Sequence, residues 1–193
     1  MNRRNFQSSD AGAEAPDAET LTDHEGSLLA LVLRRQPVTA YQLLRIYAQS
    51  PVSSFNESKG SIYPLIRRLK ARGLIAAQSV DGDGRNAERL SCTLAGRAAT
   101  RHWVMMLEPR HVLPDDPLRT KAISFDLLEA DERKAWIAAA RALTEAKIAE
   151  VEAYMIGLDF PFSAAIAANA LGVLRARFEW LDRLASTGAE RTG

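Results

Sequence analysis

Hydrophobic residues recur with helical spacing along most of the chain beyond residue 20. The clearest case is the segment 58–72, where four apolar residues fall at i, i+3, i+4 and i+7 and therefore share one face of a helix. These residues are Ile62, Leu65, Ile66 and Leu69. Gly73 follows, and glycine suits the left-handed position just past a helix end. The pattern predicts a helix with one buried face that ends at this glycine.

Two earlier helices are predicted from capping boxes, in which a Thr is followed three residues later by Glu or Gln. Thr22 opens a helix that should end near Arg35, because Pro37 disfavours its continuation. Thr39 opens a second helix that should run to about Gln49. The N-terminal half of the chain is therefore expected to begin with three helices.

An Asp-Gly turn signal at 81–84 separates two short segments, 74–80 and 87–92, that are predicted to pair as strands. Thr93 should then cap a fourth helix that runs to about residue 107. Three helices, a strand, a turn and a second strand are the order of a winged helix-turn-helix. The expected fold class is mainly α, with this winged helix-turn-helix and its small two-stranded wing followed by a helical C-terminal domain.

The C-terminal half is predicted to be entirely helical, with a short helix over 118–128, a long one over 131–156 and a last one capped by Ser163. The whole chain then divides into five parts. They are a disordered acidic tail over 1–20, the winged helix-turn-helix over 21–107, a linker over 108–117, a helical dimerisation domain over 118–187 and a disordered tail over 188–193.

Charge is unevenly distributed, although the net charge of the chain is only +1. Residues 21–92 hold ten Lys and Arg against six Asp and Glu, whereas residues 93–193 hold thirteen against fourteen. The segment 58–72 contains cations and no acid, and such a helix is suited to lie on phosphates. A basic face that is only solvated is the alternative that this segment leaves open.

The sequence GSIYPLIRRL at 60–69, followed by Gly-Leu-Ile at 73–75, resembles the recognition helix of the PadR family of bacterial transcriptional regulators. Pro64 would cost a helix interior about 3 kcal/mol, but a proline is part of the family pattern. Tyr41 and Leu43 match an upstream motif in which Thr-Ala replaces the usual His-Gly. Thr93, Ala95, Gly96 and Arg97 match a downstream motif, although Arg89-Leu90 replaces an aromatic pair.

This resemblance covers about 21–107 and implies a sequence-specific regulator that binds double-stranded DNA, with repression as the usual sign. The third helix is expected to enter the major groove. The start of the second helix should touch the DNA backbone, and the wing should contact phosphate or the minor groove. The expected DNA-binding residues are Tyr41, Gln42, Lys59, Gly60, Ser61, Tyr63, Arg67, Arg68, Lys70, Arg85 and Arg89, with Arg68, Lys70 and Arg72 as phosphate contacts or solvated charge.

The last predicted helix is apolar on two sides, one of which follows a 4-3-4-3-4 heptad spacing. A hairpin of two helices cannot cover both sides, so a second copy of the chain is expected to cover the excess. Burial against the N-terminal domain is the alternative. The residues expected to support dimerisation are Trp136, Leu143, Val151, Leu171, Leu174, Phe178 and Leu181. A homodimer predicts a pseudo-palindromic operator.

Chemistry other than binding is not expected. Cys92 is the single cysteine, so no intrachain disulfide forms and a cytoplasmic location is favoured. It has no Cys-x-x-Cys partner, and the three histidines are scattered, so no catalytic residue, metal site or cofactor is predicted. The longest low-charge run, 160–174, is too short to cross a bilayer, so no membrane partner is expected. The resemblance implies a small-molecule effector, which the sequence does not identify.

Two other classes of function remain as alternatives. A winged-helix module that binds proteins and not DNA would show no salt-dependent DNA affinity, and the acid-free helix argues against it. A small helical enzyme would need a reactive Cys92 or histidine in a pocket, and the absence of catalytic spacing argues against that.

Overall fold

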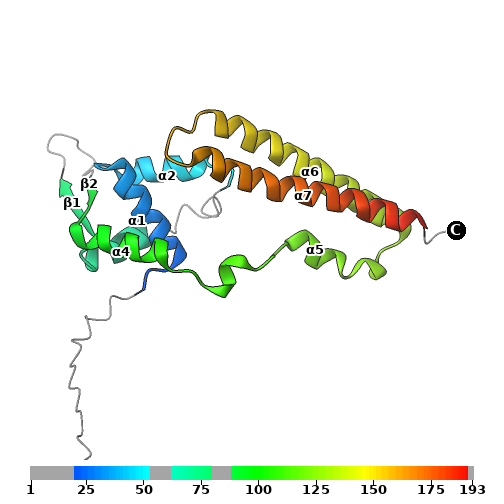
Figure 1. Ribbon diagram of the computed structural model, residues 1–193, viewed down its shortest axis with the longest axis horizontal. Coiled ribbons are helices and arrows are strands. Elements are labelled where there is room, and N and C mark those ends of the chain that lie inside the picture. Colours follow the sequence, from blue (N-terminus) through cyan, green and yellow to red (C-terminus); the bar gives the residue numbers. More distant parts are fainter. Residues whose placement is uncertain (1–19, 53–61, 80–87, 191–193) are drawn as a thin grey trace, which may run out of the picture. The chain divides into compact units, whose positions relative to one another are not determined.

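The computed structural model describes residues 20–52, 62–79 and 88–190. These residues divide into two compact units, each described here by itself. The first comprises 20–43, 62–79 and 88–107, and the second comprises 44–52 and 108–190. Figure 1 shows the elements of both units.

Three helices begin the chain, as the capping signals predict. α1 (Asp23–Arg35) and α2 (Ala40–Gln49) start directly after Thr22 and Thr39. Both capping boxes are formed: the Glu25 amide donates to Thr22 and the Gln42 amide to Thr39, while the Glu25 and Gln42 side chains accept from the Thr amides. α3 (Ile62–Ala71) completes the set.

The α3 helix buries the four apolar residues that its spacing predicts, at 5% exposure or less. Pro64 is the third described residue of α3, so it stands in the first turn, where a missing N–H removes few hydrogen bonds. Gly73 has φ +69°, the left-handed conformation expected just past the helix end. The predicted start of this helix at Ser58 lies outside the described residues.

A two-stranded antiparallel wing follows, formed by β1 (Ile75–Ser79) and β2 (Glu88–Cys92), with Ala77 opposite Leu90. Val38 extends the pairing, because its amide donates to the Leu90 carbonyl at 3.1 Å and its carbonyl accepts the Leu90 amide at 2.8 Å. The segment that leads into α2 is therefore tied to the wing. This mainly helical fold with its wing is the predicted fold class.

Helix α4 (Leu94–Met105) starts at the predicted cap, since the Thr93 hydroxyl accepts from the Gly96 amide at 3.0 Å. It packs on α1 at a point where only glycine fits. A Cβ on Gly26 would lie 2.2 Å from the Trp103 ring. The Trp103 indole N–H also donates to Asp23 at 3.3 Å, so the end of α4 is held at the start of α1.

Beyond residue 108 the second unit continues with three short helical segments, η2 (Pro109–Val112), α5 (Pro117–Ala122) and η3 (Phe125–Leu127). The prediction of one helix over 118–128 was therefore wrong. Ser124 has left the helical conformation at φ −103° and ψ 26°, which separates η3 from α5. Phe125 packs edge-on against Trp136, with ring centres 4.9 Å apart.

Two long antiparallel helices, α6 (Ala130–Ile156) and α7 (Ser163–Glu190), form a hairpin (Figure 1). Ser163 is the first residue of α7 and not its cap as predicted; the first helical hydrogen bond runs from Ile166 N–H to the Phe162 carbonyl. Phe162 has φ +66° and so turns the chain into the helix. α7 continues to Glu190, beyond the boundary expected at 187. Residues 1–19 of the acidic tail expected over 1–20 lie outside the described residues.

Candidate nucleic-acid interface

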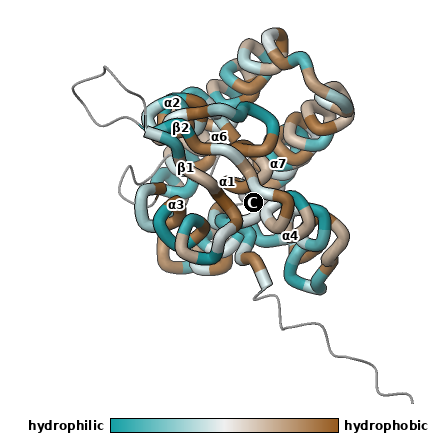
Figure 2. Tube along the Cα trace, turned by 90° about the vertical axis from the view of Figure 1, so that its left-hand side faces the viewer, coloured by the Kyte–Doolittle hydropathy of each residue, from teal (hydrophilic) through white to brown (hydrophobic). Residues whose placement is uncertain are grey.

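The outward side of α3 carries Tyr63 and Arg67, opposite the buried apolar face. Tyr63 is 49% exposed, and the guanidinium of Arg67 has no carboxylate within ion-pair distance among the described residues. Figure 2 shows both hydrophilic and hydrophobic residues along α3. A rigidly packed helix therefore presents an aromatic ring with a phenolic hydroxyl and an unpaired cation to solvent.

The position of α3 on α1 is fixed by a buried carboxylate, Glu25, which is 5% exposed. The Nε of Arg68 donates to its Oε1 at 3.1 Å, and Nη1 of Arg72 lies 3.6 Å from its Oε2. Burial by itself raises the pKa of Glu25, but the hydrogen bonds from Thr22 and the Arg68 guanidinium outweigh burial and hold the pKa below its ordinary value. Glu25 is thus charged at neutral pH.

Arg68 was expected to be either a phosphate contact or a solvated charge. Its ion pair with Glu25 shows that it is not simply solvated. The sequence signal for this contact was the spacing of Glu25, Leu28, Leu29 and Val32, which places the carboxylate on the buried face of α1. The segment 58–72 has no acid, but the fold supplies one from 43 residues earlier in the chain.

The wing is fixed to the end of α3 by polar contacts. The Nζ of Lys70 lies 2.6 Å from Glu88 at the start of β2. The Thr93 hydroxyl donates to the Gly73 carbonyl at 2.8 Å, and the Cys92 amide donates to the Gln36 side chain at 2.7 Å. Lys70 thus joins helix to wing, and Arg89 is left exposed on β2.

At the start of α2, Tyr41 is 66% exposed and Gln42 is exposed as well. The side-chain oxygen of Gln42 already accepts the Thr39 amide at 2.9 Å, so only its amide N–H groups remain to donate to a ligand. Arg45, which was not among the predicted contacts, is exposed one turn after Tyr41. The sequence feature that indicates this residue is its i, i+4 spacing from Tyr41, which places both side chains on the same face of α2.

The other predicted contacts, Lys59, Gly60, Ser61 and Arg85, lie outside the described residues. In the described part of the first unit, nine Arg and Lys stand against three carboxylates, Asp23, Glu25 and Glu88. This excess of positive charge is the electrostatic condition for binding a phosphate backbone.

The residues predicted for dimerisation fall into three groups of different exposure within the second unit. Val151 and Leu181 are fully buried where α6 and α7 pack together, so they form the core of the hairpin and leave no surface for a partner. Leu143 is 72% exposed. The remaining members are partly exposed: Trp136, Leu171, Leu174 and Phe178.

No group of three or more metal-ligating side chains is found within the described ranges. Cys92 is half-buried, and burial raises the pKa of its thiol while Arg97 partly offsets the rise. A raised pKa disfavours the thiolate that a nucleophile requires. Over the part of the chain that the structure describes, no helix is long and apolar enough to cross a membrane.

Residues 28–102 match the model of the transcriptional regulator PadR-like family. The winged helix is therefore similar to that of a family of transcriptional regulators, as the sequence motifs predict. No curated protein is similar enough in sequence to match this chain.

Solved structures share the fold over most of this chain. Bacillus subtilis PadR in complex with operator DNA has a TM-score of 0.71 at 18% identity, covering 86% of this chain and 98% of that one. Streptococcus mutans smu.1604c has a TM-score of 0.70 at 16% identity, covering 86% and 99%. Bacillus subtilis PadR has also been solved with p-coumaric acid, with a TM-score of 0.67, 18% identity and coverage of 86% and 98%.

Proposed function

We propose that this PadR-like protein is a repressor that acts as a homodimer on a pseudo-palindromic DNA operator. The observation that carries the proposal is the outward side of α3, where Arg67 and Tyr63 stand free beside arginines anchored to Glu25. An anchored helix loses little conformational freedom on binding, and a free guanidinium can bind phosphate or a guanine edge. Operator DNA in the complex with Bacillus subtilis PadR supports this reading.

Seven residues on α2, α3 and the wing have a place in this scheme. Tyr63 and Arg67 would enter the major groove, while Tyr41 and Arg45 would lie along the backbone beside it. Arg89, on the wing, would reach phosphate or the minor groove. Arg68 and Lys70 would contact phosphate more weakly than Arg67, because Glu25 and Glu88 neutralise part of their charge although both side chains stay partly exposed.

The proposed dimer would form through the hairpin of the second unit. Ile166 and Val173 are 49% and 55% exposed on one side of α7, and Leu143 is exposed on α6. Apolar surface of this kind on long helices is commonly covered by a second copy. Val173→Glu is expected to give monomers in sedimentation equilibrium. Ala168→Glu, at an exposed position off this stripe, is expected to leave the dimer intact.

Operator binding is tested by fluorescence anisotropy with DNA from immediately upstream of the protein's own gene, at several salt concentrations and with random DNA as competitor. Binding that survives the competitor and weakens with salt is the expected result. If no DNA selected from a random pool binds in a salt-dependent way, the winged helix is a protein-interaction module. The sign of regulation is tested with a reporter gene in cells with and without the protein.

A small-molecule effector is part of the proposal, supported by the p-coumaric acid complex of Bacillus subtilis PadR. The first probe is therefore p-coumaric acid, added to the preformed complex with operator DNA. Release of the DNA would identify an aromatic acid as effector, whereas unchanged binding would exclude this compound. A cytoplasmic location is part of the proposal, because a regulator that binds operator DNA acts where that DNA is transcribed.

A further inference from the structure

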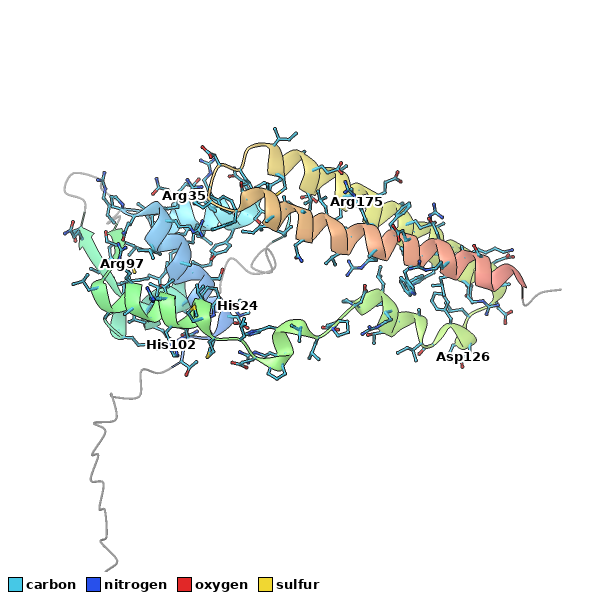
Figure 3. The ribbon with its side chains drawn as sticks, in the orientation of Figure 1. His24, Arg35, Arg97, His102, Asp126 and Arg175 are labelled. Carbon is cyan, nitrogen blue, oxygen red and sulfur yellow. The ribbon has the colours of Figure 1, made fainter. Side chains whose placement is uncertain are left out.

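A shallow hollow of about 500 Å³ lies between α1 and α4, away from the outward side of α3. Leu33, Leu94 and Ala98 supply an apolar floor, and Leu94 is 87% exposed. Arg97 and Arg101, one helical turn apart on α4, line the same hollow. Figure 3 labels Arg97, which stands at the wing end of α4.

These two arginines have no carboxylate partner among the described residues. Each acid in the described part of this unit is already engaged: Asp23 with Trp103, Glu25 with Arg68 and Arg72, and Glu88 with Lys70. The hollow therefore combines uncompensated positive charge with exposed apolar surface. An acidic segment with small apolar side chains has the matching chemistry.

We propose that the hollow docks the acidic N-terminal segment of the same chain. Residues 10–19 have the sequence DAGAEAPDAE, in which Asp10, Glu14, Asp17 and Glu19 are separated by small residues, mainly alanine. Carboxylates would pair with Arg97 and Arg101, and alanine methyl groups would lie on the apolar floor. Residues 1–19 lie outside the described residues. The proposal is based on their sequence and on the point where they join α1.

The attachment point allows this docking. The chain enters α1 at Thr22, where Trp103 of α4 contacts Asp23, and the hollow begins at Leu33. At about 1.5 Å per residue, α1 carries the chain roughly 16 Å from Thr22 to Leu33. An extended segment covers about 20 Å in six residues, so Glu14 and Asp10 can reach the arginines, while Glu19 is too close to its anchor.

The test is paramagnetic relaxation of methyl signals in the full-length protein. A spin label is attached through Ser9→Cys in a Cys92→Ser background, and the methyl groups of Leu33 and Leu94 are observed. Docking predicts strong broadening of both signals, which disappears on reduction of the label and weakens in about 0.5 M salt. Broadening of the α3 methyl signals in place of these would overturn the proposal.

Charge-reversal variants separate specific docking from general attraction. Arg97→Glu with Arg101→Glu is expected to abolish the broadening, while Arg67→Glu with Arg89→Glu makes the same change in net charge on α3 and the wing and should preserve it. An equal loss of broadening in the two double variants would contradict docking in the hollow. In a mixture of spin-labelled chains and observed unlabelled chains, broadening would show that the segment docks on another copy, which also overturns the proposal.

Chemical cross-linking tests the same docking without reversing any charge. Arg101→Lys keeps the positive charge and supplies an amine that a carbodiimide joins to a nearby carboxylate as an amide, with loss of water. Mass spectrometry should identify a link from position 101 to Glu14 or Asp10 within one chain. A correctly folded variant whose links go only to carboxylates outside 10–19 would contradict the proposal.

Discussion

The carboxylate of Glu25 and the guanidinium of Arg68 meet at 3.1 Å across 43 residues of sequence. The carboxylate is buried and the arginine is about half exposed, with side-chain exposures of 7% and 57%. Glu25 also accepts the Thr22 amide at 3.1 Å, so one side chain caps α1 and anchors α3. This contact links the start of the fold to the proposed recognition helix.

Glu25→Gln should lower the free energy of unfolding by about 2 kcal/mol, because a buried ionic hydrogen bond is replaced by a neutral one. Urea unfolding followed by circular dichroism measures the change. Glu150→Gln is the matched control, since its ion pair with Lys147 is exposed and should contribute less than about 0.5 kcal/mol. Equal losses in the two variants would contradict the anchoring role.

Stability should decrease on acidification through two carboxylates, Glu25 and Asp116. Burial by itself raises the pKa of Asp116, but hydrogen bonds from Arg177 and the Leu118 amide outweigh it and lower the pKa. Each group therefore binds a proton more readily in the unfolded chain, so its stabilisation is complete above the unfolded pKa and is lost as pH falls through the folded one.

The measurement is the free energy of unfolding at a series of pH values below about 5.5, since unfolded carboxyl groups titrate near pH 4. Glu25→Gln with Asp116→Asn should flatten the profile, because neither amide titrates. A double variant with the slope of the unaltered protein would show that other carboxylates control the acid response.

Neighbouring arginines on α3 should have different effects. Arg67→Ala should weaken DNA binding and reduce the slope of log affinity against log salt by about one, with unfolding unchanged. Arg68→Ala should lower the melting temperature, because it removes a partner of Glu25. Anisotropy and thermal unfolding of both variants measure the difference. An Arg67→Ala protein with unchanged affinity and salt slope would contradict the assignment of α3.

Gly96→Ala should be strongly destabilising, by about 2 kcal/mol or more, because the added Cβ would lie 2.2 Å from the Leu74 carbonyl oxygen where α4 meets the wing. Gly172→Ala is the contrast within α7, where nothing lies within 4 Å of the added Cβ. It should stabilise the helix by about 1 kcal/mol. Unfolding in urea distinguishes the two, and a tolerated Gly96→Ala would contradict this close approach.

Asp116 both caps α5 and pairs with Arg177 of α7, whose Nε lies 2.8 Å from its Oδ2. Asp116→Asn retains a capping oxygen, whereas Asp116→Ala removes cap and ion pair together. The alanine variant should lose about 1–2 kcal/mol, and the asparagine variant less than half of that. Equal losses, measured by thermal unfolding, would show that the ion pair and not the cap stabilises this end of the unit.

Local signals in the sequence determined much of this protein. The capping boxes at Thr22 and Thr39, the cap at Thr93 and the left-handed Gly73 each act within a few residues, so the sequence places the helices and the wing of the N-terminal half. The helix predicted over 118–128 lacked such a stop signal at Ser124, and there the prediction was wrong. Apolar spacing on α3 likewise fixed which side of that helix is buried and which carries Tyr63 and Arg67.

Tertiary structure decided which charges remain free. Glu25 and Glu88 neutralise part of the α3 surface from distant positions, because packing brings α1 and the wing against it, and periodicity holds no information on such pairs. Packing of α6 on α7 in the same way buried Val151 and Leu181 while Leu143 stayed exposed. Local sequence sets the shape of each helix, and the neighbours of its side chains are settled only when the helices pack.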